Sequence, residues 1–266
     1  MAPRPTRKKV AEAESIGADW QRRVVGRSLR TAAERSVDRG RSLITAAAVV
    51  LERSGGDDIT VQEVADEAGQ SLRTLYQYFE SKDDLLLAVF EEAMRAYAEL
   101  IERAISDLTD PLERLAGAMV AAARMPELGR SGVGRGLVRL RLRLSEVGPD
   151  QVGRAQSAVT ALVSELVHAA AAAGAIDVAD PEAATFMLMS LNASVITAAT
   201  IGNDAGVRPP DVAGIASFCM RGLGADLPPK WYEKTSARLH LPGGQSRRAR
   251  PAASTASRAP ARRPKK

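Results

Sequence analysis

Polar and cationic side chains gather in one short stretch of this chain, residues 71–82, which reads SLRTLYQYFESK. If the stretch is a helix, three apolar residues share one narrow arc and should face a core, namely Leu72, Leu75 and Phe79. The opposite side and its edge then carry hydrogen-bonding groups, namely Arg73, Thr74, Tyr76 and Gln77. Groups of these types contact the base edges and phosphates of nucleic acids. The segment therefore predicts recognition of DNA rather than a bond-making reaction.

The residues on either side predict how this short helix is held. Thr60 followed by Glu63 three positions later is a capping-box pair, so a preceding helix should begin directly after Thr60. Gly69 can end that helix, because a residue without Cβ adopts the left-handed conformation at no steric cost. Ser71 can cap the next helix, and Ser81 repeats the capping signature before a longer one. Two short helices joined by a tight turn form a helix-turn-helix, which presents its second helix to the major groove.

The order of these residues resembles the DNA-binding domain of the TetR/AcrR (tetracycline-repressor) family of bacterial transcriptional regulators. The resemblance covers about residues 40–90, and residues 43–56 are similar to that family's first helix. It rests on matches in register at Ile59, Thr60, Val64, Ala65, Ala68, Gly69, Ser71, Thr74, Leu75, Tyr76, Tyr78, Phe79, Ser81, Lys82, Leu85 and Leu86. It implies an all-α protein, with an N-terminal three-helix helix-turn-helix domain followed by a C-terminal helical bundle for ligand binding and dimerisation.

The resemblance also implies roles for single residues. Thr60 at a helix start, Tyr76 and Lys82 match positions that contact phosphate. Residues 72–74 occupy the base-reading stretch, where Arg73 is the candidate for a guanine contact because guanidinium fits O6 and N7 bidentately. A phosphate contact is the alternative for that side chain. The full set of DNA-binding candidates is Arg41, Thr60, Val61, Gln62, Ser71, Leu72, Arg73, Thr74, Tyr76, Gln77, Tyr78 and Lys82.

Two positions depart from the family's pattern. Gln70 stands where the family usually has an apolar residue, which loosens the packing of the turn or adds a polar contact. Tyr78 stands where a histidine is common, and its alternative interpretation is a partly buried packing residue.

The net charge of +5 is unevenly spread along the 266 residues. Residues 246–266 contribute +8 and residues 1–41 contribute +6, which leaves −9 for residues 42–245. Residues 42–82, which include the predicted DNA reader, are themselves net negative. The two basic ends are therefore predicted to supply the nonspecific attraction to polyanions. Residues 20–33 have a weak helical pattern and could form an extra helix, an arm that orders on DNA, or a solvated tail.

Composition and helix breakers predict the rest of the architecture. Apolar residues make up 45% of the chain and aromatic residues only 4%, which favours helix packing over a sheet sandwich. Helical patterns cover about residues 111–124, 133–147, 150–173, 181–201 and 210–223. The stretch LVRLRLRL within the second of these alternates like a strand, but its leucines also recur at helical spacing, so we interpret it as helix.

The predicted domains are a basic N-terminal extension (1–37), a helix-turn-helix domain (38–85), a helical ligand-binding and dimerisation domain (86–228) and a Pro/Arg-rich basic tail (229–266) that is expected to be disordered.

A long uncharged stretch, residues 183–203, predicts the dimer interface. Its length raises the possibility of a membrane helix, but its Ser, Thr and Asn residues and the lack of Lys or Arg at its ends favour a buried helix. A helix that is apolar all round must be covered on every side, which a partner chain can do. The interface candidates are Leu188, Leu191, Asn192, Val195, Ile215, Phe218 and Leu223.

A ligand pocket in the body would be mostly apolar. Its candidates are Met119, Met125, Arg141, Phe186 and Met189, although core packing explains the apolar ones more simply. Arg141 falls within an apolar arc of its predicted helix, where a cation needs an anion. That anion could be an acidic effector or a Glu or Asp of a neighbouring helix.

Enzyme chemistry finds no support in the sequence, because no phosphate-binding loop or nucleophile with a base at telling spacing is present. With a single cysteine, Cys219, and two histidines, neither a disulfide nor a zinc site is expected, and no cofactor is expected.

We interpret the chain as a homodimeric, ligand-responsive transcriptional repressor of the bacterial cytoplasm and nucleoid. Its expected partners are a double-stranded DNA operator, a second copy of itself and an unknown small-molecule effector, with no membrane. The alternatives are a nonspecific DNA-bridging architectural protein that uses the basic tails, or a helical ligand-binding module with a vestigial DNA domain.

Overall fold

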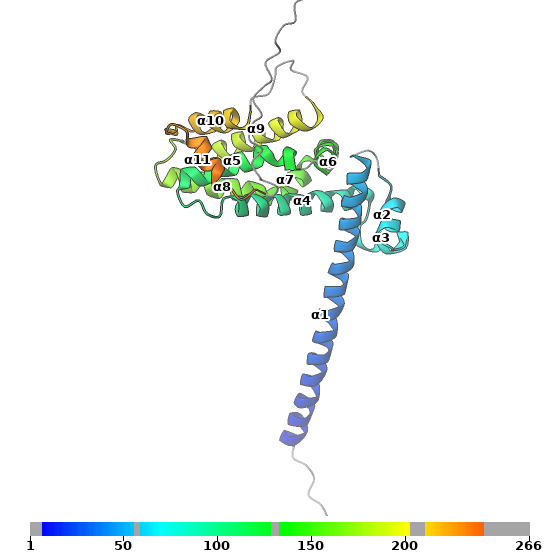
Figure 1. The fold of residues 1–266 in the computed structure, drawn as a ribbon. Coiled ribbons are helices and arrows are strands. Elements are labelled where there is room, and N and C mark those ends of the chain that lie inside the picture. Colours follow the sequence, from blue (N-terminus) through cyan, green and yellow to red (C-terminus); the bar gives the residue numbers. More distant parts are fainter. Residues whose placement is uncertain (1–6, 56–58, 129–132, 203–210, 242–266) are drawn as a thin grey trace, which may run out of the picture.

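A computed structural model describes residues 7–55, 59–128, 133–202 and 211–241 of the chain, and every regular element in these ranges is an α-helix (Figure 1). The predicted all-α class is therefore confirmed. The N-terminal helices are α1 (Arg7–Ser54), α2 (Val61–Glu67), α3 (Leu72–Tyr78) and α4 (Lys82–Ala104). The body adds α5 (Pro111–Leu128), α6 (Val133–Val147), α7 (Pro149–Ala155), α8 (Ser157–Ala172), α9 (Pro181–Ile201), α10 (Val212–Gly222) and α11 (Trp231–Ala237).

The N-terminal core lies between the last turns of α1, the short helices α2 and α3, and the first half of α4. Leu43 on α1, Leu75 on α3 and Phe90 on α4 are fully buried and belong to the same cluster. Each buried leucine or phenylalanine removed from water contributes about 1.5–3 kcal/mol to folding. Two helices of only two turns each cannot be stable alone, so this shared core holds the helix-turn-helix together.

The first helix is much longer than the domain that it enters. Sequence analysis placed a domain boundary at residue 38, whereas α1 runs without interruption from Arg7 to Ser54. Of the alternatives for residues 20–33, the structure has the helix. Residues 32–39 are all exposed, and Figure 1 shows the blue part of α1 standing away from the rest of the molecule.

The body has a second core, which α4, α5, α8, α9 and α10 enclose. Ile101, Leu115, Val167 and Met220 come from four of these helices and are almost fully buried in one cluster. The predicted helix over residues 150–173 is broken at Gln156 into α7 and α8. The break lets the two parts enter different cores, because α7 packs into the N-terminal core whereas α8 packs into that of the body.

Two helices of the body complete the N-terminal core. Leu140 and Leu144 of α6, with Val152 and Ala155 of α7, are buried in the same cluster as the helix-turn-helix residues. A polar contact reinforces this junction, because Arg143 Nη2 of α6 lies 3.1 Å from Asp83 Oδ1 of α4. The alternating stretch interpreted as a helix is thus α6, and its leucines Leu140 and Leu144 face the N-terminal helices.

The body continues beyond the boundary predicted at residue 229, which was too early. Residues 231–237 form α11, Thr235 is buried, and Trp231, Leu239 and Leu241 pack against the core of the body. The His240 amide donates to the Ala104 carbonyl at 3.0 Å. The prediction was wrong because the Pro- and Arg-rich composition was extended over a segment whose apolar residues find a partner. The remainder of the predicted tail, residues 242–266, lies outside the described residues.

This packing predicts a difference between two truncations. A chain that ends at residue 228 should unfold at a lower temperature than one that ends at residue 241, because only the first removes α11 and the apolar side chains that follow it. Leu239→Ala alone should cost about 1–2 kcal/mol, as expected for a half-buried leucine. Thermal unfolding followed by circular dichroism measures both effects. Equal midpoints for the two truncations would show that α11 does not stabilise the body.

Candidate DNA-binding surface

Hydrogen bonds at its first residues fix the start of α2. The Glu63 amide donates to Thr60 Oγ1 at 3.2 Å, and the Thr60 amide donates to Glu63 Oε2 at 2.7 Å. This is the predicted capping box. The backbone and side-chain hydrogen bonds from Thr60 lower the pKa of Glu63, and the charges of Arg53 and Lys82 lower it further.

The turn and the start of α3 also follow the predicted pattern. Gly69 has φ +62°, the left-handed conformation that favours glycine. The Thr74 amide donates to Ser71 Oγ at 3.1 Å, and the two hydroxyl oxygens lie 2.9 Å apart. Gln70, which departs from the family's pattern, has its side-chain oxygen buried with no hydrogen-bond partner among the described residues.

The two sides of α3 differ as the helical spacing predicts. Leu75 is fully buried and Phe79 is nearly so. Arg73, Tyr76 and Gln77 are exposed, and Tyr76 keeps 53% of its surface in contact with solvent. The buried side fixes the rotation of the helix, so these three side chains form one rigid polar surface.

The other DNA-binding candidates divide into surface and packing residues. Thr60, Gln62 and Ser71 are exposed, and Gln62 Nε2 donates to Asp66 Oδ1 at 2.8 Å. Three candidates are half-buried and pack against the N-terminal core, namely Val61, Leu72 and Tyr78. Tyr78 lies over α1 at Gly40, where an added Cβ would stand 3.7 Å from its ring. This position favours the packing interpretation of Tyr78.

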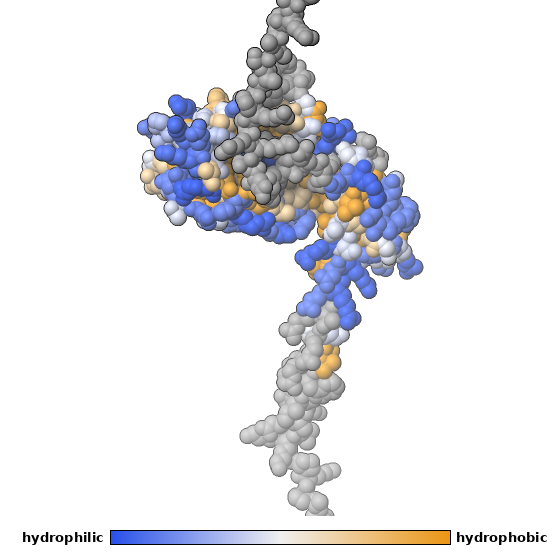
Figure 2. Space-filling model, viewed as in Figure 1, coloured by the Kyte–Doolittle hydropathy of each residue, from blue (hydrophilic) through white to orange (hydrophobic). Residues whose placement is uncertain are grey.

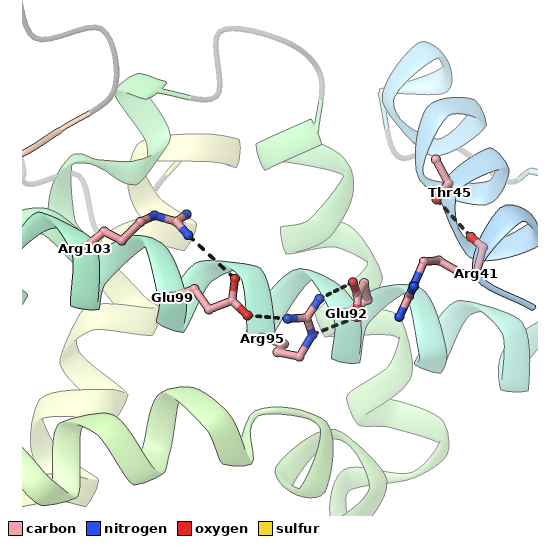
Figure 3. Close-up of polar contacts among 6 residues, drawn as sticks. All are labelled: Arg41, Thr45, Glu92, Arg95, Glu99 and Arg103. Carbon is pink, nitrogen blue, oxygen red and sulfur yellow. Dashed lines mark hydrogen bonds and ion pairs between the residues drawn. The ribbon is translucent and has the colours of Figure 1, made fainter. Parts of the chain in front are cut away.

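The side chain of Arg41 points from α1 toward α4 (Figure 3). Figure 3 shows its side chain reaching from α1 toward Glu92 on α4, beside the ion pairs that Arg95 makes with Glu92 and Glu99. The hydrogen bond from Arg95 lowers the pKa of Glu92, and the Arg41 charge adds a smaller effect in the same direction. Sequence spacing could not reveal this position, because it depends on how α1 crosses α4.

The predicted pocket residues have different surroundings, although Met119 and Met189 belong to the same core of the body. Met119 is buried in the core of the body, and Met189 and Arg141 are half-buried. Phe186 was predicted wrongly, since 73% of its surface is exposed on the outer side of α9. No ion-pair partner for Arg141 occurs within the described part of the chain, and the side chain of Met125 lies outside it.

A buried polar group that sequence analysis did not assign to a pocket lies between α4, α5 and α9. The Tyr97 hydroxyl donates to the Ala122 carbonyl at 3.2 Å. Burial raises the pKa of Tyr97 to about 12, and a hydrogen bond from Asn192 partly opposes that shift. The Asn192 side-chain oxygen is buried and has no hydrogen-bond partner in the described structure. An unpaired buried acceptor costs about 1–3 kcal/mol.

Most of the predicted dimer contacts are buried inside one protomer. Leu188 and Asn192 lie on the inner side of α9, and Ile215 and Leu223 lie on the inner side of α10 and just after it. These four predictions were wrong as surface residues, because an uncharged helix shows no polar side from which its inward side could be read. Leu191 and Val195 are half-buried against the same core.

The exposed sides of α9 and α10 nevertheless carry large apolar residues. Phe218 is 70% exposed, Phe186 is 73% exposed and Met187 is 65% exposed. Figure 1 shows α9 and α10 along the same edge of the body. Among the described helices α9 alone is long and apolar enough to span a membrane, with a mean hydropathy of 1.5 and 22% of the apolar window buried in the protomer.

Comparison with known proteins bears on the N-terminal part of the chain. A family model described as "Bacterial regulatory proteins, tetR family" matches residues 43–89. The transcriptional regulator HbdR of Aromatoleum sp. (strain CIB) is 36% identical over 84 residues, which are 32% of this chain and 37% of that protein. The fatty acid metabolism regulator protein of Bacillus subtilis (strain 168) is 34% identical over 74 residues, 28% of this chain and 38% of that protein. The chain thus matches less than half the length of these curated relatives.

Solved structures share the fold over a longer range. RolR in complex with resorcinol superposes with a TM-score of 0.57 at 19% identity, covering 79% of this chain and 98% of RolR. The fatty acid degradation regulator FadR from Bacillus halodurans superposes with a TM-score of 0.54 at 20% identity, covering 70% of this chain and 94% of FadR. At such identities the likeness concerns the fold. The capped α2 and α3 and the buried Leu75 lie within residues 43–89, so this part of the chain matches the bacterial regulatory proteins of the tetR family in sequence and has their helix-turn-helix fold.

Proposed function

We propose that this protein is a transcriptional regulator, most simply a repressor, that binds an operator as a homodimer and changes its DNA affinity when a small molecule binds the body. The observation that carries the proposal is the polar side of α3, where Arg73, Tyr76 and Gln77 are exposed on a helix whose other side is locked into the core by Leu75. DNA recognition needs such a rigid helix with a few side chains that reach base edges. A regulator of bacterial genes acts in the cytoplasm.

The side chains divide by chemistry into readers and anchors. Arg73 has the geometry for a bidentate guanine contact. The hydroxyl groups of Tyr76 and Thr60 can donate to phosphate, and Lys82 can pair with it as a point charge. Two copies of α3 would meet successive major grooves when their centres lie about 34–36 Å apart.

A competition experiment tests operator recognition. The wild-type protein should prefer DNA from the promoter region of its own gene over random duplex by roughly 10³-fold or more. Arg73→Ala should weaken operator binding by about 10- to 100-fold and reduce that preference, since a bidentate contact contributes about 1–3 kcal/mol of discrimination. Tyr76→Phe should weaken binding to both DNAs alike. Fluorescence anisotropy with both duplexes measures these effects.

Arg103→Ala is the matched control, because Arg103 is an exposed arginine at the far end of α4 that pairs with Glu99 at 3.7 Å (Figure 3). Its operator affinity should equal that of the wild type. Equal binding of operator and random DNA by the wild-type protein would instead support an architectural, DNA-bridging role.

We propose the outer sides of α9 and α10 as the homodimer interface. Isolated apolar side chains are common on surfaces, but Phe186, Met187 and Phe218 are three large ones on one edge of the body. In a two-fold symmetric dimer, both protomers use the same edge. The three side chains of each protomer would then be buried against the other protomer. This pairing also covers the side of α9 that the protomer leaves exposed, without a membrane.

Charge placed on this edge should separate the protomers. Phe186→Glu with Phe218→Glu should convert a dimer into a monomer in analytical ultracentrifugation and lower operator affinity by at least 100-fold, because each half-site then binds alone. Leu142→Glu is the control, since Leu142 is 40% exposed on α6 and lies outside this edge. A wild-type monomer, or a dimer that persists in the double variant, would contradict the proposed interface.

For the effector response, we propose that the polar group around Asn192 contacts the ligand. Its surroundings are apolar, so the ligand would be largely apolar with a hydrogen-bond donor for the unpaired oxygen. The body can pass a change to α3 through α6, whose Leu140 and Leu144 pack into the N-terminal core and whose Arg139 donates to the Gly55 carbonyl at 3.3 Å. Such coupling requires that the ligand binds the two arrangements of the body with different affinity.

Asn192→Leu should separate stability from response. The substitution removes an unpaired buried acceptor at similar volume, which offsets the loss of the hydrogen bond to Tyr97, so the midpoint of thermal unfolding should change little. Release of operator DNA by the metabolite found in a screen should need at least tenfold more ligand. Thr185→Val is the control on the same helix, because the Thr185 hydroxyl already donates to the Pro181 carbonyl at 2.8 Å. An unchanged response in Asn192→Leu would exclude this position from the effector site.

A further inference from the structure

Residues 32–39 of α1 lie outside both packed cores and are all exposed. Among the side chains of α1 that the structure describes, those from Leu43 onward enter the N-terminal core. At a rise of about 1.5 Å per residue, residues 20–41 form a rod of about 30 Å. Isolated helices of this kind are marginal in water, so a binding partner would stabilise this one.

Charge identifies the kind of partner. Residues 20–41 contain seven arginines, no lysine and two acidic residues, a net charge of +5. Residues 42–82, which include α2 and α3, contain three basic and seven acidic residues, a net charge of −4. Figure 2 shows hydrophilic side chains around α1 directly beyond the N-terminal domain. A DNA duplex carries about one negative charge per 1.7 Å, so the reading domain by itself repels it and the rod attracts it.

The apolar residues of the rod fit a second copy less well. Val24, Val25, Leu29 and Val37 are exposed, and the sequence adds Trp20, but the spacing of these residues does not repeat with a heptad period. A stable pair of helices needs apolar residues at both core positions over three or four heptads. These five residues are too few and too dispersed among arginines for a helix that enters lipid.

We propose that residues 20–41 of α1 form a phosphate-binding rod, which lies against the DNA backbone beside the half-site that α3 reads. The rod supplies affinity and lengthens the contacted DNA, whereas α3 supplies sequence preference. The proposal rests on the proposed function, because α1 continues directly into the domain that holds α3. It adds a second DNA contact outside the residues that match the family.

The test uses the full-length protein with Arg22, Arg23, Arg27 and Arg30 changed to Gln, a residue that keeps helix propensity. Each phosphate contact contributes about 0.9 to the slope of log affinity against log salt, so the slope should fall by about 2 to 4. Affinity for operator and for random duplex should fall by the same factor, about 10- to 1,000-fold at low salt. Hydroxyl-radical footprints should lose protection at the outer edge of each half-site. Glu34→Gln with Asp38→Asn should change the slope in the opposite direction.

A matched control removes the same charge elsewhere, by Arg247, Arg248, Arg250 and Arg258→Gln in the C-terminal tail. In that variant the DNA at the outer edge of each half-site should stay protected from hydroxyl radicals, whether or not the slope of log affinity against log salt changes. An unchanged slope and footprint in the α1 variant would overturn the proposal. So would a change of oligomeric state in ultracentrifugation, because it would identify the rod as a contact between copies.

Failure of the proposed function has a different result. If the wild-type protein shows no operator preference, the proposed regulatory function is refuted. The proposal that α1 binds phosphate is then tested by the salt dependence of binding to random duplex alone. Circular dichroism of each variant confirms that helix content is retained. A loss of slope with retained helix content supports the rod in either case.

Discussion

The insertion of Leu75 and Phe79 into the N-terminal core is the interaction on which the rest of the structure depends. It fixes the rotation of a helix of seven residues, which has too few internal hydrogen bonds to be stable alone. Since residues three and four positions apart share a side of a helix, this burial leaves Arg73 and Gln77 on the opposite side. The direction in which Arg73 and Gln77 point, on which the proposed function depends, is therefore set by an apolar contact.

That core is also where the body can act on the DNA reader. Leu144 of α6 and Val152 of α7 belong to the body by sequence, but they are buried with α1 and α3. A packed core does not deform continuously, so a shift of α6 must be taken up by the helices that contact it. Arg143 and Asp83 add a polar contact at the same junction, 3.1 Å apart. The two domains are thus coupled through shared packing instead of a flexible linker.

Sequence alone predicted the features that local chemistry determines. The capping residues Thr60, Ser71 and Ser81 set helix starts through hydrogen bonds over three positions, and all three were found as predicted. The outward side of α3 followed from its spacing. The inward side of α9 could not be predicted, because a helix without charge gives no contrast between its sides, and so Leu188 and Phe186 were assigned to the wrong surroundings. The full length of α1 was missed, and the boundary at residue 229 was placed before α11, because each depends on contacts or continuity beyond a local window.

Affinity and specificity are separated along this chain. The helix-turn-helix segment is acidic, and Glu63, Asp66 and Glu67 lie on α2 itself, with Glu67 paired to Arg53 at 3.0 Å. An acidic DNA-binding segment has a low affinity for nonspecific DNA, because the phosphates repel its carboxylates. Only a favourable contact with a base offsets this repulsion. Attraction to the duplex must then come from elsewhere in the chain, and the arginines of α1 are joined to the reader by an unbroken helix. Under the proposed function, the attractive charge of α1 brings the protein to any duplex, while the acidic surface of α2 penalises each site at which Arg73 finds no partner.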